Sequence, residues 1–265
     1  MTNATKPTAV LEFNFDAALH TDVGQRRKNN QDFGAIRPDL GLFLVADGMG
    51  GHSGGEVASQ LCAETIVAFI AEAYEKQDYQ PIDDPTLLDR AIQKANLALI
   101  EKAKDSPELK GMGTTVTAIK ISGKTATIAQ VGDSRCYYFS HHGIWQMTRD
   151  HSLVQEKLRA GLIKRDQVKS DEMRNVITRS VGYDATLRVD LYSFSVEPGD
   201  GFLLCSDGLS GPLEEFEIFD ILEINRKEKQ PANMATKNLV DLANKKGGDD
   251  NITAVMVRCN STGKT

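Results

Sequence analysis

Residues 115–147 read TVTAIKISGKTATIAQVGDSRCYYFSHHGIWQM, and this stretch decides the fold class. It contains four short runs rich in β-branched and aromatic residues, at 115–121, 125–131, 136–140 and 144–147. Such residues are enriched in β-strands. Two polar triplets that contain glycine, 122–124 and 141–143, separate neighbouring runs and are typical of hairpin turns. The stretch therefore predicts antiparallel strands joined by tight turns.

Helical patterns lie on both sides of this stretch, with apolar residues spaced three and four positions apart along one face. The expected helices are 54–75, 85–104, 153–168, 213–222 and 232–244. Further strands are expected at 11–18, 42–46, 188–196, 201–205 and 252–257. Helices that come in pairs between groups of strands argue against a doubly wound parallel sheet. We therefore predict an α+β fold, in which two packed antiparallel β-sheets are flanked by helix pairs.

The chain of 265 residues shows no internal repeat, no low-complexity segment and no linker rich in proline or glycine. This length lies within the range of a single domain. We expect one domain at 9–259, with tails at 1–8 and 260–265. Residues 169–184 have no clear period, and we expect a mobile flap within about 164–184.

The composition is that of an ordinary globular protein, with 40% apolar and 26% charged residues and a net charge of −6. Charges of both signs are mixed along the chain, which argues against a nucleic-acid partner. The longest apolar runs have about six residues, far fewer than a membrane span needs. The first ten residues do not resemble a signal peptide, and the four cysteines are widely spaced. We therefore expect a cytoplasmic protein with reduced thiols and no membrane partner.

Aspartates stand at the ends of several apolar runs. Asp47 and Asp207 each follow such a run and precede a glycine, Asp133 follows 129–132, and Asp250 directly precedes the last predicted strand. Asp32 comes after the first strand. Strand ends can converge in space, and crowded carboxylates then need cations or altered protonation. Oxygen ligands select hard ions such as Mg²⁺ or Mn²⁺. A single Asp-Gly pair is also a common turn, but the repeated placement favours a metal centre.

Seven stretches, taken in order, make the chain similar to a known family. They are Thr21-Asp22-Val23-Gly24 with Arg27 and Asn29-Asn30-Gln31-Asp32; Asp47-Gly48-Met49-Gly50-Gly51-His52; Gly111-Met112-Gly113-Thr114-Thr115; Val131-Gly132-Asp133-Ser134-Arg135; Asp150-His151-Ser152-Leu153-Val154; Ser206-Asp207-Gly208-Leu209; and Asp250-Asn251-Ile252-Thr253. The sequence resembles the metal-dependent serine/threonine protein phosphatases of type 2C, in their bacterial form. The resemblance spans residues 21–253. It implies a four-layer αββα sandwich and hydrolysis of phosphoserine and phosphothreonine in proteins.

The resemblance also implies a centre with two ions of Mn²⁺ or Mg²⁺. Asp47 would bridge both ions, and the Gly48 carbonyl would complete one of them. Asp207 and Asp250 would hold the other ion. Asp133 would join Asp207 in a weaker third site. Two such ions can share a water and lower its pKa, so that the resulting hydroxide attacks phosphorus without a phosphoenzyme intermediate.

Further roles follow from the same resemblance. Asp32 would be a ligand or would orient bound water, whereas Gln31 stands where many relatives carry glutamate, which argues against a ligand role for it. Arg27 would grip the phosphate with its planar guanidinium, although the run 26–28 could also be a solvated basic surface. His52 could donate a proton to the leaving oxygen, or it could only shape its loop.

Two other functions remain as alternatives. The chain could be a regulatory module that keeps the fold and binds phosphoproteins without turnover, or a phosphoesterase for small metabolites. The presence of Asp47, Asp207 and Asp250 favours an active phosphatase, because degenerate members of such families usually lose metal aspartates. The expected partners are phosphorylated proteins, including a Ser/Thr kinase and its substrates, and nothing in the sequence demands more than a monomer.

Overall fold

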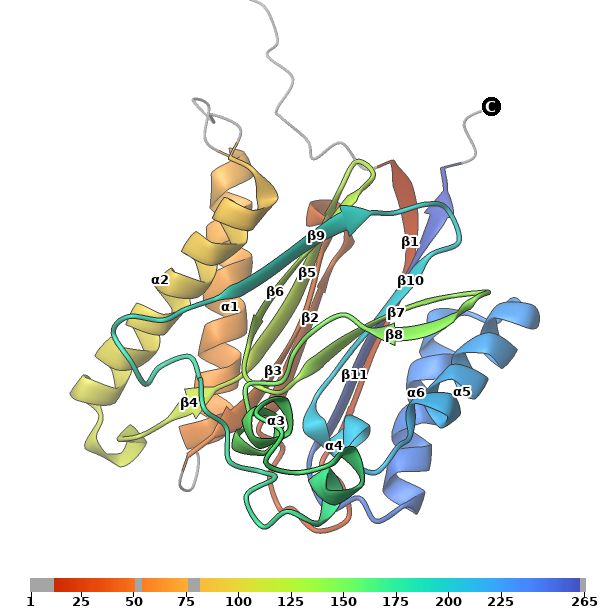
Figure 1. The fold of residues 1–265 in the computed structure, drawn as a ribbon. Helices are drawn as coiled ribbons and strands as arrows, with labels where there is room; N and C mark the ends of the chain where they lie inside the picture. Colours follow the sequence, from red (N-terminus) through yellow and green to blue (C-terminus); the bar gives the residue numbers. More distant parts are fainter. Residues whose placement is uncertain (1–11, 51–53, 76–81, 263–265) are drawn as a thin grey trace, which may run out of the picture.

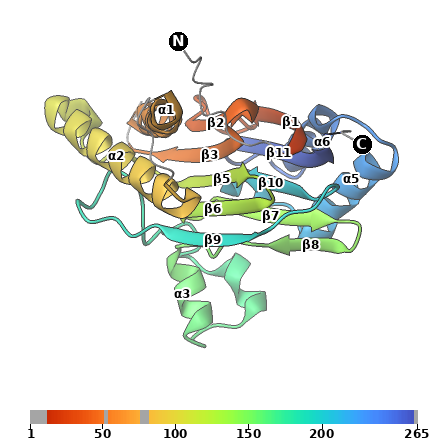
Figure 2. The ribbon, with the colours of Figure 1, turned by 90° about the horizontal axis from the view of Figure 1, so that it is seen from above.

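The computed structural model describes residues 12–50, 54–75 and 82–262. Two antiparallel sheets lie face to face at its centre (Figures 1 and 2). One has five strands in the order β1-β11-β10-β7-β8. Their bounds are β1 Phe13–Asp22, β7 Arg135–Ser140, β8 Gly143–Gln146, β10 Gly201–Cys205 and β11 Ile252–Ser261.

The second sheet runs in the order β2-β3-β5-β6-β9, and the short strand β4 pairs with β3. Its strands are β2 Asp32–Arg37, β3 Leu42–Met49, β4 Gly113–Thr114, β5 Val116–Ser122, β6 Thr125–Val131 and β9 Asp190–Ser195. The two predicted hairpin turns are confirmed, because Ser122 pairs with Thr125 and Ser140 pairs with Gly143.

Helices cover the outer face of each sheet, which confirms the expected four-layer sandwich (Figure 2). The helices α1 and α2 lie against the six-stranded sheet, and α5 and α6 lie against the five-stranded sheet. The short helices α3 and α4 both lie toward the lower end of the sandwich as it is drawn in Figure 1. The bounds are α1 Gly54–Glu75, α2 Asp84–Asp105, α3 Leu153–Arg159, α4 Asp207–Ser210, α5 Glu215–Lys227 and α6 Ala232–Lys245.

Three apolar layers hold these elements together. Residues such as Ile66, Leu88 and Leu44 fill the layer between the first helix pair and its sheet. Phe43 and Phe202 belong to the layer between the two sheets. The third layer joins the five-stranded sheet to α5 and α6. Burial of apolar surface on both sides of each sheet keeps the strands in one register, so the loops at the strand ends are held in fixed positions.

Strand β2 was not predicted from the sequence. Gly34 interrupts its apolar pattern, and the structure explains that glycine, because an added Cβ would lie 2.5 Å from Cδ1 of Leu19 on the facing strand β1. Any side chain at position 34 would therefore require the Leu19 side chain to move.

Several predicted boundaries were wrong. Strand β11 continues to Ser261, which pairs with Phe13, so residues 260 and 261 belong to a strand and not to a tail. Edge pairing with β1 supplies the hydrogen bonds that extend it. Helix α3 ends at Arg159 instead of 168, since Gly161 takes a left-handed φ of 71° just beyond it.

The predicted flap, 164–184, contains a 3-10 helix at Arg165–Ser170 and little other regular structure. Its later part is tied to the body of the molecule, because Ile177 bridges to Ser152 and Val181 bridges to Thr114.

Helix α1 is the one described helix that is long and apolar enough to span a membrane by length and composition alone. Core helices pass the same test. In the structure, α1 places Ala58, Cys62, Ile66 and Ile70 against the six-stranded sheet, where all four are fully buried. The helix therefore acts as a core element of this fold.

Candidate metal centre

Five predicted aspartates come together from loops and strand ends on both sheets. Asp32 begins β2 and stands opposite Asp47 near the end of β3, so the register of one strand pair places these two carboxylates side by side. Asp133 lies in the turn between β6 and β7, Asp207 begins α4 directly after β10, and Asp250 precedes β11. The sandwich thus gathers residues that are far apart in the sequence.

The charges of these aspartates act on one another. Burial raises the pKa of Asp47 well above its usual range, and the charges of Asp32, Asp207, Asp133 and Asp250 raise it further. Burial also raises the pKa of Asp207, and the charge of Asp250 raises it further. Raised pKa values mean that the site disfavours the ionised form of its carboxyl groups. A bound cation reverses this preference, because it stabilises the negative charges.

Two more carboxyls show the same effect. The pKa of Asp32 is raised to about 7, first by burial and then by the charges of Asp207 and Asp250, although a hydrogen bond from Ser206 opposes the change. The pKa of Asp133 is also raised to about 7, mainly by burial and by Asp207. The two residues of the predicted third site, Asp133 and Asp207, are thus close enough for the charge of Asp207 to raise the pKa of Asp133.

Asp32 has one satisfied and one orphan oxygen. The Ser206 hydroxyl donates to its Oδ2 at 2.7 Å, whereas its buried Oδ1 has no hydrogen-bond partner in the structure. A buried acceptor without a donor is costly in a folded protein. The free oxygen of Asp32 is therefore suited to contact a cation, or a water molecule bound to a cation.

Gly48 sits where no side chain fits. A Cβ at this position would lie 1.9 Å from the Gly55 carbonyl oxygen and 2.6 Å from that of Gln31. Gly208, after the second aspartate, is equally confined, since its Cβ would lie 1.9 Å from the Asn251 carbonyl oxygen. Both Asp-Gly pairs are therefore fixed by close backbone packing, which a common surface turn does not require.

Asn251 is a structural residue of the centre that sequence reasoning missed. Its Nδ2 donates to the carbonyls of Val23 and Asn29, each at 2.9 Å, and its Oδ1 accepts from the Gln31 amide at 2.8 Å. It holds the loop before β2 against the start of β11. Its place next to Asp250 in a matching motif was the available signal.

Arg27 reaches the centre from an exposed position. Its guanidinium donates to Oδ2 of Asp250 at 2.7 Å, and its side chain is 53% exposed. The neighbouring Arg26 instead lies 3.7 Å from Asp249, at the outer surface. The two arginines thus differ in position, with Arg27 directed at the aspartate cluster and Arg26 at the surface.

His52 lies outside the described residues, so its role stays a prediction. His151 is buried, and its Nδ1 accepts a hydrogen bond from the Gly132 amide at 3.0 Å, so it holds the turn before Asp133.

The donor set fits hard divalent cations. It consists of carboxylate oxygens, including the orphan oxygen of Asp32, and the backbone carbonyl of Gly48. Within residues 12–50, 54–75 and 82–262, no three His, Cys, Asp or Glu side chains already stand as a finished ligand group.

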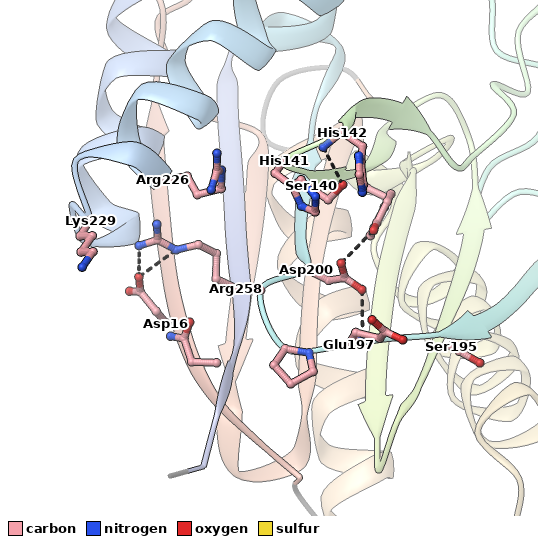
Figure 3. A pocket seen from close by; sticks show the side chains of 14 residues that line it. Asp16, Ser140, His141, His142, Ser195, Glu197, Asp200, Arg226, Lys229 and Arg258 are labelled. Atoms are coloured by element: carbon pink, nitrogen blue, oxygen red, sulfur yellow. Dashed lines mark hydrogen bonds and ion pairs between the residues drawn. The ribbon is translucent and has the colours of Figure 1, made fainter.

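A polar pocket of about 700 Å³ lies at the opposite ends of the strands (Figure 3). Two of its cations are paired within the protein. Arg258 donates to Asp16, and Arg226 donates through Nε and Nη2 to Glu223, at 2.7 and 2.8 Å. None of the five aspartates lines it. The pocket is separate from the candidate metal centre.

An αββα sandwich with an oxygen-only acidic centre at its strand ends defines a protein of the metal-dependent phosphatase class. The chain belongs to the protein phosphatase 2C family, because the model described as Protein phosphatase 2C matches residues 23–242. The serine/threonine phosphatase stp of Listeria monocytogenes is 34% identical over 251 residues, which cover 94% of this chain and 97% of that protein.

Solved structures agree with this assignment. The serine/threonine phosphatase PstP/Ppp of Mycobacterium tuberculosis superposes with a TM-score of 0.82 at 33% identity, covering 93% of this chain and 99% of that one. The catalytic domain of PstP in complex with two manganese ions superposes with a TM-score of 0.81 at 32% identity, covering 93% and 98% of the two chains.

Proposed function

We propose that this chain is a metal-dependent protein phosphatase, which removes phosphate from phosphoserine and phosphothreonine. The observation that carries the proposal is the convergence of Asp32, Asp47, Asp133, Asp207 and Asp250 in a member of the protein phosphatase 2C family. The cofactor is Mn²⁺ or Mg²⁺, and a relative of the same fold carries two manganese ions.

The metal roles of individual residues are part of the proposal. Asp47 and the Gly48 carbonyl would hold one ion, and Asp47, Asp207 and Asp250 would hold the second. Asp133 with Asp207 would provide a weaker third position. Divalent ions bound there would supply an activated water and would balance the charge that develops on the phosphate.

The remaining residues bind and orient. Arg27 exchanges its contact with Asp250 for two oxygens of the substrate phosphate, since a guanidinium offers a planar two-point fit. Asp32, held by the Ser206 hydroxyl at 2.7 Å, orients the attacking water through its second oxygen. His52 donates a proton to the leaving serine or threonine oxygen.

We also infer the setting in which the enzyme acts. One catalytic domain extends from about residue 9 to Ser261 at the end of β11, with the flap at 164–184, and the chain acts as a cytoplasmic monomer. The four cysteines are unpaired and buried, which supports a reducing compartment. Its partners are phosphorylated proteins, including a Ser/Thr kinase and the substrates of that kinase.

Phosphate release from a phosphothreonine peptide tests the proposal. Wild type should turn over with Mn²⁺ and stop with EDTA, and Asp207→Asn should be folded but nearly inactive. Asp220→Asn, which removes an exposed carboxylate of α5, is the matched control and should keep full activity. Mn²⁺ binding without turnover of peptide or aryl phosphate would contradict the proposal and favour a regulator that binds phosphoproteins. Faster turnover of nucleotides than of phosphopeptides would favour a phosphoesterase for metabolites.

A further inference from the structure

The motif Gly111-Met112-Gly113-Thr114-Thr115 has no part in the function described so far. Its two threonines are buried beside the metal centre; Thr114 ends β4, and Thr115 lies between β4 and β5. We propose that the Thr115 hydroxyl is a positioning group that couples the loop of Asp47 to the turn of Asp133. This inference rests on the proposed metal roles of those two aspartates.

The threonine pair fixes the backbone of Asp47 on both sides. The Asp47 amide donates to Oγ1 of Thr115 at 3.0 Å. The Asp47 carbonyl accepts from the Thr115 amide and from the Thr114 hydroxyl, each at 2.8 Å. The placement of Asp47 therefore depends on these two residues.

The same hydroxyl also reaches the second loop. Oγ1 of Thr115 lies 2.7 Å from Oγ of Ser134, which follows Asp133 and is fully buried. Gly132, on the other side of Asp133, has a φ of 102°, and an added Cβ there would lie 2.5 Å from the Thr115 methyl carbon. The two branches of one side chain thus contact both neighbours of Asp133.

The turn that carries Asp133 is otherwise rigid. The Thr117 hydroxyl donates to the Ser134 carbonyl at 2.7 Å, and the Gly132 amide donates to Nδ1 of His151 at 3.0 Å. A turn held this firmly transmits a displacement instead of absorbing it. Because the Thr115 hydroxyl contacts both the Asp47 amide and Ser134, one hydroxyl links the two loops directly.

Valine has nearly the shape of threonine but lacks the hydroxyl, so it isolates this contribution. Thr115→Val keeps a methyl group against Gly132, leaves the buried Asp47 amide without an acceptor and breaks the link to Ser134. Loss of an outer partner of a metal ligand typically lowers metal affinity about 10- to 100-fold. We expect a loss of that size for Mn²⁺ in Thr115→Val, and near wild-type affinity in Thr115→Ser, which restores the hydroxyl.

Calorimetric titration of the full chain with Mn²⁺ tests the inference without requiring turnover. The matched control is Thr127→Val, which removes the hydroxyl of another fully buried threonine and breaks its hydrogen bond to the exposed Ser193, at 3.1 Å, between β6 and β9. It should bind Mn²⁺ as wild type does, even if its free energy of unfolding falls by a similar amount. If Thr127→Val weakens binding as much as Thr115→Val, the effect is general destabilisation and the inference is wrong.

Ser134→Ala keeps the inference testable if Thr115→Val does not fold, because it removes the other partner of the same link. Ser134→Ala should weaken the lower-affinity phase of Mn²⁺ binding more than the tighter one. Combining Ser134→Ala with Thr115→Val should give less than the sum of the separate effects, because both changes break one link. Unchanged binding in Ser134→Ala, or strict additivity, overturns the coupling. If wild type binds Mn²⁺ but lacks phosphatase activity, the proposed function fails while this inference still stands.

Discussion

The stability of the metal-free protein should fall as the pH rises from 5.5 to 7.5. The pKa of Asp32 and that of Asp133 are raised from 3.8 to about 7 on folding, chiefly by burial. A raised folded-state pKa contributes stability that is fully present below the unfolded pKa and is lost as the pH passes the folded pKa. For this pair of values the window runs from about pH 4 to about pH 7.

The magnitude follows from the same pair of pKa values. For one carboxyl with pKa values of 3.8 unfolded and about 7 folded, the free energy of unfolding falls by about 2 kcal/mol between pH 5.5 and pH 7.5. His151 acts in the opposite direction, because burial lowers its pKa below 6.5. At pH 5.5, one unit below the ordinary pKa of 6.5, keeping this histidine neutral lowers the free energy of unfolding by at most about 1.4 kcal/mol. Since several carboxyls of the centre share the upward shift, their effect should dominate.

Urea unfolding in EDTA, followed by tryptophan fluorescence, measures this slope. Excess Mn²⁺ should reverse its sign, because metal binding requires ionised carboxylates and favours the folded state more strongly at high pH. Asp32→Asn should make the metal-free slope shallower, and the exposed control Asp220→Asn should not. Equal stability of metal-free wild type at pH 5.5 and pH 7.5, with no change in Asp32→Asn, would refute the reasoning.

Three further changes test other parts of the centre. Gly48→Ala places a Cβ 1.9 Å from the Gly55 carbonyl oxygen. We therefore expect the free energy of unfolding, measured in urea, to drop by about 1–3 kcal/mol and Mn²⁺ binding to weaken. Wild-type values for both would contradict the packing argument. Arg27→Ala should raise KM for a phosphopeptide about tenfold, as expected for one lost charge-assisted hydrogen bond, while Arg26→Ala should leave it unchanged; equal effects would refute the phosphate role. Replacing residues 165–176 with a glycine-serine linker should alter peptide preference more than aryl phosphate turnover, and kinetics that change equally on both substrates would count against a flap that selects substrates.

The sequence predicted the elements whose signals are local. The helices at 54–75 and 232–244 and the hairpins within 115–147 follow from periodicity and turn residues, which depend on near neighbours alone. Strand β2 was not predicted, because Gly34 is explained only by Leu19 of the facing sheet. Likewise, β11 runs to Ser261 because β1 pairs with it, a contact between the two ends of the chain.

The candidate site divides in the same way. The sequence by itself determined which residues could bind metal, because an aspartate at the end of an apolar run, followed by glycine, is visible in the order of residues. Only the tertiary structure decided that Asp47, Asp133 and Asp250 share one electrostatic environment, that Ser206 satisfies a single oxygen of Asp32, and that the Thr115 hydroxyl joins two loops. Burial, mutual charge and hydrogen bonding depend on distances between groups, and these distances exist only once two sheets have packed together.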